Sequence, residues 1–193
     1  MEVKELEPFP AQDIAWCPGC GNFGIRTTLM KALAEMETDL TKLVLVSGIG
    51  QAAKLPHYVK SHVFNGLHGR ALPPATAIRV ANPELTVIVE SGDGDMYGEG
   101  GNHFIHTIRR NPNITCFVHD NMVYGLTKGQ YSPTSELGKK TKTTPHGSID
   151  RPFSPVAVAL GAGATFVART VDSDLAHMAQ VLRRAAEHEG TAF

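Results

Sequence analysis

The sequence is poor in cysteine and in aromatic residues, and its charges nearly cancel. Its 193 residues include 3 cysteines, 7% aromatic residues and a formal net charge of −1. An odd number of cysteines, two of them in a Cys-x-x-Cys pair, argues against a disulfide framework. The balanced charge leaves no electrostatic footprint for nucleic acid or for an anionic membrane.

The sequence also lacks a long hydrophobic run and a recognisable targeting segment. A membrane-spanning helix needs about 18 consecutive apolar residues, and no stretch approaches that length. The start, MEVKELEPFP, is acidic and has no apolar signal-peptide core. We therefore expect a cytoplasmic protein that binds neither membrane nor nucleic acid.

Hydrophobic residues, at 42%, are sufficient for a folded core, and the length is typical of one domain.

Short apolar runs predict buried strands at 43–46, 85–89, 114–118 and 164–168. Apolar residues at helical spacing predict helices over 22–36, between Pro73 and Pro83, around 104–108 and over 175–185. Asp172 or Ser173 is the expected N-cap of the last helix. Strands that are apolar on both faces and alternate with helices indicate an α/β fold, a doubly wound, mostly parallel sheet with helices on both faces.

The sequence predicts an N-terminal arm followed by a single domain. Residues 1–21 are expected to form an irregular arm that carries the Cys-x-x-Cys pair, and 22–193 to form one domain. The stretch 125–155 has no periodicity, and a loop of that length is usually functional or mobile.

Glycine and polar residues follow three of the predicted strands. They are Ser47-Gly-Ile-Gly50, Ser91-Gly-Asp-Gly-Asp95 and His119-Asp-Asn121. Ligands of open α/β sheets bind at the carboxyl ends of the strands, so a carboxylate at Asp93 and an amide oxygen at Asn121 should converge there. Such oxygen ligands suit Mg²⁺ with a bound diphosphate. An ordinary glycine-rich turn with an N-cap aspartate is the alternative.

The spacing between two of these stretches resembles a known cofactor-binding signature. Gly92-Asp93-Gly94 is followed by the 25 residues 95–119 and then by Asp120-Asn121. This resembles the thiamine diphosphate signature, in which Gly-Asp-Gly precedes Asn-Asn by about 25 residues. The resemblance implies that Asp93, Asn121 and the backbone carbonyl of Val123 hold Mg²⁺. Asp120 replaces the first asparagine of the signature.

Further stretches narrow the family: Trp16-Cys-Pro-Gly-Cys-Gly21, Ser47-Gly-Ile-Gly50, Asn65-Gly-Leu-His-Gly-Arg70 and Asn121-Met-Val-Tyr-Gly-Leu-Thr-Lys-Gly-Gln130. Together they resemble the β subunit of 2-oxoacid:ferredoxin oxidoreductases, the 2-oxoglutarate and pyruvate synthase type. The resemblance implies oxidative decarboxylation of a 2-oxoacid with coenzyme A, with thiamine diphosphate as the electron sink. Electrons would leave through an iron–sulfur cluster to ferredoxin.

The resemblance also implies roles for single residues. His68 and Lys128 are the catalytic candidates. A cationic Lys128 opposite an acidic substrate tail favours 2-oxoglutarate over pyruvate, and Lys54 is a second candidate partner for a carboxylate. The residues expected to contact the cofactor are Ile49, Gly50, Gln51, Ala52, His68, Gly94, Asp95, Gly125 and Leu126.

The iron–sulfur ligands depart from the family pattern. In the family, cysteines at the positions of Cys17 and Cys20 hold a [4Fe–4S] cluster together with two further cysteines. The third position is Gln51 here, and the fourth lies beyond Phe193. Four thiolates are the usual requirement, and two are present here. We expect a chain that is shortened relative to the family; in the full-length protein the cluster would be held by three cysteines and another ligand, or would be absent. By residue type alone, Cys17 and Cys20 could also be half of a zinc site or a redox dithiol. Cys116 lies in the middle of a predicted strand and is expected to be buried and structural.

A thiamine enzyme also needs a glutamate against the aminopyrimidine ring of the cofactor. The matching segments belong only to the diphosphate-binding domain, which implies an α subunit with a pyrimidine-binding domain, in a heterodimer or a dimer of heterodimers. Ferredoxin, coenzyme A and the 2-oxoacid are the other implied partners. Two alternatives stay open: a cluster-less thiamine-dependent lyase or decarboxylase subunit, which Gln51 favours, and an inactive domain that serves as a scaffold.

Overall fold

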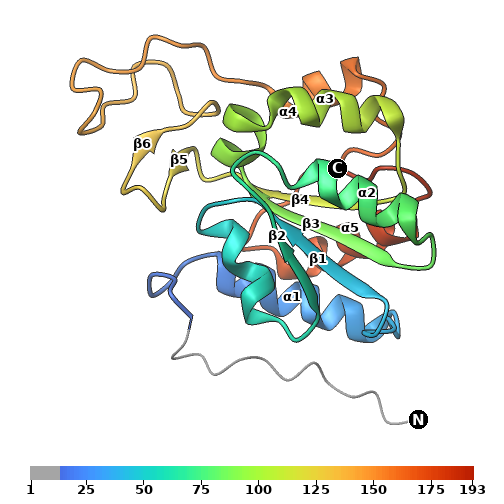
Figure 1. The fold of residues 1–193 in the computed structure, drawn as a ribbon. Coiled ribbons are helices and arrows are strands. Elements are labelled where there is room, and N and C mark those ends of the chain that lie inside the picture. Colours follow the sequence, from blue (N-terminus) through green and yellow to red (C-terminus); the bar gives the residue numbers. More distant parts are fainter. Residues whose placement is uncertain (1–13) are drawn as a thin grey trace.

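A four-stranded parallel sheet forms the centre of the molecule in a computed structural model that describes residues 14–193 (Figure 1). Its strands are β1 (Leu43–Ser47), β2 (His62–Asn65), β3 (Thr86–Gly92) and β4 (Thr115–His119). They lie in the order β2-β1-β3-β4, and each neighbouring pair is parallel. The carboxyl ends of β1, β3 and β4 therefore meet at one edge of the sheet.

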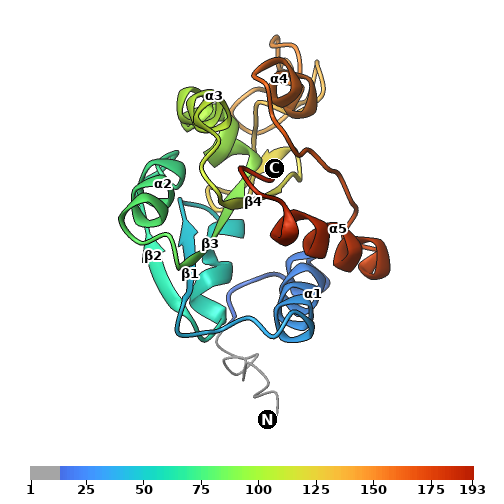
Figure 2. The same ribbon diagram turned by 90° about the vertical axis from the view of Figure 1, so that its right-hand side faces the viewer.

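Helices cover both faces of this sheet (Figure 2). One face carries α1 (Asn22–Glu35) and α5 (Leu175–Glu187); the other carries α2 (Leu72–Ala81), α3 (Gly101–Arg110) and α4 (Pro155–Gly161). Within β1, Leu43 and Leu45 belong to the α1/α5 core, whereas Val44 and Val46 belong to the opposite core. Since successive strand side chains point to opposite faces, a continuous apolar run is what a doubly covered strand needs. The predicted doubly wound α/β fold is confirmed.

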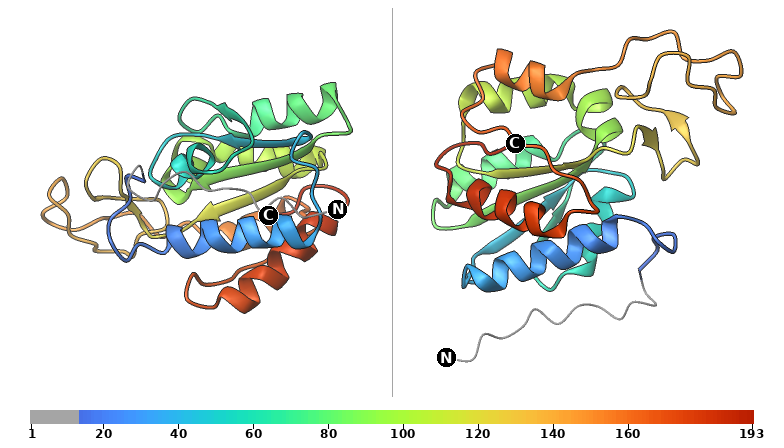
Figure 3. Two further views of the ribbon diagram at one scale, coloured as in Figure 1. Left: turned by 90° about the horizontal axis from the view of Figure 1, so that it is seen from below. Right: turned by 180° about the vertical axis from the view of Figure 1, so that it is seen from behind.

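The two helices on the first face lie side by side, as Figure 3 shows from below and from behind. Leu29 and Leu33 of α1 and Leu182 of α5 belong to the same apolar core. An ion pair between Arg183 and Glu35 joins their exposed sides. None of the helices in residues 14–193 combines the length and the apolar character that a membrane crossing requires.

Two predicted details at the C-terminal end are wrong. Residues 164–168 do not form a strand: only Phe166 makes a bridge, to Ala192, which also bridges Thr115. The last helix is capped by Asp174, whose carboxylate accepts from the backbone N–H of His177 at 2.9 Å, and not by Asp172 or Ser173. The strand prediction fails because Ala192, from the last residues of the chain, holds the place beside β4.

Short elements were absent from the predictions. They are β2, α4, a 3-10 helix at Ala52–Tyr58, a π-helix at Gly94–Glu99, and the antiparallel pair β5 (Val123–Tyr124) and β6 (Gln130–Tyr131). The stretch 125–155 is otherwise irregular, as expected, and projects from the end of the sheet (Figure 1). Residues 14–21 carry no helix or strand, and α1 begins at Asn22; residues 1–13 of the predicted arm lie outside the described residues.

Candidate cofactor-binding site

The ends of β1, β3 and β4 open into one cavity of about 670 Å³. The predicted residues that line it are Ile49, Gly50, Gln51, Ala52, His68, Asp93, Gly94, Asp95, Asn121, Val123, Gly125 and Leu126, together with Cys17 and Cys20. Lys128 is not among the lining residues; it is exposed, in the turn between β5 and β6, with a left-handed backbone (φ 76°). The sequence thus identified this edge of the sheet, and the role of each residue stays a prediction.

Asp93 lies directly after β3 and is only 2% exposed. Its Oδ2 accepts hydrogen bonds from Ser132 Oγ at 2.5 Å and from Thr134 Oγ1 at 2.7 Å. Burial raises the pKa of this carboxyl, and the two hydroxyl hydrogen bonds oppose that rise. Both hydroxyls come from the irregular loop, 39 and 41 positions further on, and sequence reasoning missed them. The three hydroxylated residues of Ser132-Pro-Thr-Ser135 were the one available signal.

Thr134 also brings a second carboxyl close to Asp93. Its Oγ1 lies 2.8 Å from Oδ1 of Asp120, and the charge of Asp120 further raises the pKa of Asp93. A hydroxyl has a single proton to donate, so Thr134 can donate to one of the two carboxyls at a time. A cation beside Asp93 would relieve the repulsion that remains between the two carboxylates.

The loop after β4 is shaped by Asn121. Its Oδ1 accepts from the backbone N–H of Val123 at 3.2 Å, and Met122 between them has a left-handed backbone (φ 57°). Gly125 follows, where a Cβ would lie 3.6 Å from Gln51 Cγ and 3.9 Å from Asn121 Nδ2. The loops after β1 and β4 therefore approach each other across Gly125.

This donor set fits magnesium with a diphosphate. One carboxylate, one amide oxygen and one carbonyl oxygen leave coordination sites for water and phosphate oxygens, as Mg²⁺ prefers. Residues 14–193 hold no cluster of three or more His, Cys, Asp or Glu side chains that could bind a metal without a ligand's help. Gly50, with φ 134° and open space where a Cβ would stand, leaves room for a ligand at the end of β1.

Gly94 also makes room for an aromatic side chain. A Cβ there would lie 2.3 Å from the ring of Tyr124, whose hydroxyl donates to the Gly94 carbonyl at 3.3 Å. Gly98 faces the same side chain, since its Cβ would lie 2.3 Å from the Tyr124 hydroxyl. These glycines let the tyrosine from the loop after β4 lie across the π-helix.

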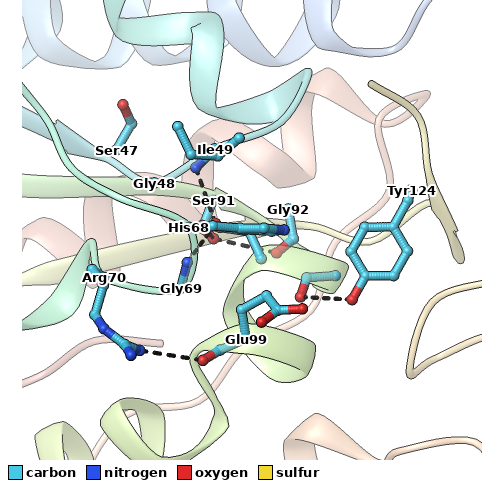
Figure 4. Close-up of polar contacts among 12 residues, drawn as sticks. Ser47, Gly48, Ile49, His68, Gly69, Arg70, Ser91, Gly92, Glu99 and Tyr124 are labelled. Carbon is cyan, nitrogen blue, oxygen red and sulfur yellow. Dashed lines mark hydrogen bonds and ion pairs between the residues drawn. The ribbon is translucent and has the colours of Figure 1, made fainter. Parts of the chain in front are cut away.

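Asp95 is buried and fully hydrogen-bonded within the protein. Its Oδ1 accepts from the backbone N–H groups of Ile49 at 3.0 Å and Gly69 at 2.8 Å, and lies 2.5 Å from His68 Nδ1. Its Oδ2 accepts from Ser91 Oγ at 2.6 Å. Figure 4 shows Ile49, His68, Gly69 and Ser91 gathered at the start of the π-helix, with the His68 ring extending toward Tyr124.

Cys17 and Cys20 flank a tight turn that lines the cavity, in which Cys20 N–H donates to the Cys17 carbonyl at 3.1 Å. Gln51 lies nearby: its backbone carbonyl accepts from Trp16 Nε1 at 2.8 Å, and its side-chain Oε1 is buried without a partner in the described chain. Cys116 is buried, and burial strongly raises the pKa of its thiol, in agreement with the expected structural role.

Comparison with known proteins assigns the chain to a family. Residues 44–193 match the model of the thiamine pyrophosphate enzyme, C-terminal TPP binding domain. The chain therefore belongs to the thiamine pyrophosphate enzymes, of which it carries the C-terminal TPP-binding domain.

Particular relatives narrow the comparison. The chain is similar to the 2-oxoglutarate oxidoreductase subunit KorB of Mycobacterium tuberculosis (50% identical over 182 residues, covering 94% of this chain and 49% of that protein). It is similar also to the 2-oxoacid:ferredoxin oxidoreductase subunit beta of Saccharolobus solfataricus (49% identical over 180 residues, 92% and 59%). Among solved structures it matches the 2-oxoglutarate:ferredoxin oxidoreductase from Magnetococcus marinus, with 2-oxoglutarate, coenzyme A and succinyl-CoA bound, at a TM-score of 0.94 and 43% identity, over 100% of this chain and 65% of that one. The chain thus spans about half to two thirds of the length of these relatives.

Proposed function

We propose that this chain is the thiamine diphosphate- and Mg²⁺-binding β subunit of a 2-oxoacid:ferredoxin oxidoreductase. The observation that carries the proposal is the convergence of Asp93 and Asn121, from the ends of neighbouring strands, on one cavity. The relatives named above support the reaction class. The reaction is the coenzyme A-dependent oxidative decarboxylation of a 2-oxoacid, with transfer of electrons to ferredoxin.

In this proposal each part of the cavity has a task. Asp93, Asn121 and the Val123 carbonyl hold Mg²⁺, and the backbone at Gly94 and Gly125, with Leu126, contacts the diphosphate. The stretch Ile49, Gly50, Gln51 and Ala52 lies along the reacting ring. Thiamine diphosphate, when bound, supplies the electron sink that decarboxylation of a 2-oxoacid requires. The protein binds the cofactor, fixes its orientation and excludes water from the reacting atoms.

The exposed side chains near the cavity support a proposal for the substrate and for the partner subunit. Leu126 is 41% exposed, and Lys128 stands beyond it in an exposed turn. We propose that an α subunit with a pyrimidine-binding domain covers this side in the cytoplasm, in a heterodimer or a dimer of heterodimers. Lys128 would then meet the distal carboxylate of 2-oxoglutarate, for which a cation is the natural partner.

The test is steady-state kinetics of the chain assembled with its α subunit. The assembly should reduce ferredoxin only when a 2-oxoacid and coenzyme A are both present. Lys128→Ala should raise KM for 2-oxoglutarate about tenfold or more and leave KM for pyruvate within about twofold, because only the first substrate has a second carboxylate. Lys142→Ala, in the same loop, is the matched control. An equal effect on both substrates would contradict the role of Lys128.

Gln51 favours a second candidate, a thiamine-dependent lyase or decarboxylase subunit without a cluster. Cys17, Cys20 and Gln51 all line the cavity, and an amide at position 51 supplies no thiolate for a cluster. Anaerobic iron and sulfide analysis of the assembled protein separates the candidates. About four irons per β subunit would support the oxidoreductase. Iron-free protein that still decarboxylates a 2-oxoacid would support the lyase.

A further inference from the structure

Four donors surround the carboxylate of Asp95, and one of them is a side chain of the cavity wall. The Asp95 side chain is 2% exposed, whereas that of His68 is 40% exposed. Ile49 N–H, Gly69 N–H and Ser91 Oγ–H can only donate in these contacts. The carboxylate therefore joins the end of β1, the loop before α2 and the end of β3, and it is held rigidly where it meets His68 Nδ1.

This contact fixes which nitrogen of His68 carries the proton. The carboxylate accepts at 2.5 Å, so Nδ1 is the protonated nitrogen of the neutral ring. Nε2 then carries the lone pair, and it has no hydrogen-bond partner within the described part of the chain. The Tyr124 ring, 6.2 Å away and at 89°, restricts rotation of the imidazole by an edge-to-face contact (Figure 4). His68 thus offers a proton acceptor to the cavity that it lines.

We propose that Asp95 is a positioning residue that holds His68 as the Nδ1–H tautomer, so that Nε2 accepts the proton of the thiol substrate, coenzyme A. This inference rests on the proposed function. Among the proposed substrates the 2-oxoacid, ionised at neutral pH, offers only oxygen acceptors, and the thiol is the group with a proton to give. The S–H proton moves to Nε2, the bonding pair stays on sulfur as the thiolate nucleophile, and the Asp95 carboxylate balances the charge of the imidazolium.

The tautomer can be measured without cofactor or partner. Long-range ¹H–¹⁵N spectra of the full chain at about pH 8, assigned with His68→Gln, should show His68 protonated on Nδ1. Ser91→Ala removes only the hydrogen bond to Oδ2 and should keep this signature, whereas Asp95→Ala should lose it. If Asp95→Ala does not fold, the wild-type spectrum still decides. A wild-type His68 protonated on Nε2 would overturn the proposal.

Kinetics of the assembled enzyme test the chemical step. His68→Gln should lower kcat for acyl-CoA formation about 100-fold, with KM for the 2-oxoacid within about twofold, and Asp95→Asn should lower kcat about tenfold. A raised KM for the 2-oxoacid with unchanged kcat would show that His68 binds that substrate, and would overturn the inference. If wild-type protein shows no thiamine-dependent turnover, the proposed function fails, while the spectra still report on the Asp95–His68 pair.

Discussion

Glu90 is a buried carboxyl that has no part in the proposed reaction. It lies in β3 and is 0% exposed; its Oε2 is 2.9 Å from His119 Nε2, and its Oε1 has no partner among the described residues. Burial raises its pKa, and the contact with His119 opposes that rise. A carboxyl whose pKa is raised on folding binds its proton more tightly in the folded state. It therefore stabilises the fold at low pH, and this contribution is lost as pH rises through the folded-state pKa.

Glu90→Gln should isolate this dependence. The amide keeps the volume of the side chain and does not ionise. We expect the free energy of unfolding of the wild type, relative to Glu90→Gln, to fall as pH rises above about 4.3, the ordinary pKa of glutamate. Urea unfolding at a series of pH values provides the measurement. Glu136→Gln, at an exposed position, is the control, and a wild-type-to-variant difference that does not change with pH would refute the assignment.

Single residues of the site were predictable where local sequence sets them. Asp93 and Asn121 follow apolar strands at a recognisable spacing, and the structure brings both to the predicted cavity. Ser132 and Thr134 were not predictable, because their contact with Asp93 depends on how a long irregular loop returns to the sheet. The link from Asp95 to His68 was hidden in the same way, since it joins the π-helix after β3 to the loop before α2.

At the scale of elements, the turn before α2 depends on glycine. Gly69 has φ 69°, and a Cβ there would lie 2.4 Å from the backbone carbon of Glu99. Gly69→Ala should destabilise the fold by more than about 1 kcal/mol, because it combines a left-handed backbone with a backbone clash. Gly101→Ala, where a Cβ meets nothing within 4 Å, is the matched control and should be neutral or stabilising. Denaturant midpoints for the two variants test this, and equal midpoints would contradict the expected clash.

The start of α5 offers a second test at this scale. Asp174→Ala removes the oxygen that accepts from His177 N–H and should cost about 1 kcal/mol of unfolding free energy. Ser173→Ala, one position earlier, should cost less than about 0.5 kcal/mol. If thermal unfolding shows the larger loss for Ser173→Ala, the cap assignment is wrong.

Long elements were predicted better than short ones for a physical reason. The strands β1, β3 and β4 are apolar on both faces, and the helices around them repeat their apolar positions over several turns. The pair β5 and β6 has two residues in each strand, too few for any period. All four residues of β2 are exposed, so its sequence lacks the apolar signature of a buried strand.

At the scale of the whole molecule, the cavity lies at the carboxyl ends of neighbouring parallel strands of the sheet. Parallel strands place their carboxyl ends together, and the doubly wound arrangement leaves a crevice at that edge. Fold class and the location of the site were predictable together, since both follow from apolar strands that end in glycine and polar residues.

The central claim is that Asp93 and Asn121 hold Mg²⁺ for thiamine diphosphate. Calorimetric titration of thiamine diphosphate into the chain assembled with its α subunit tests this directly. We predict saturable binding with Mg²⁺, loss of binding in a metal chelator, and affinity at least about tenfold weaker for Asp93→Asn, which keeps the side-chain volume but loses the charge. Equal affinity of wild type and Asp93→Asn, or binding that is unchanged by the chelator, would contradict the account.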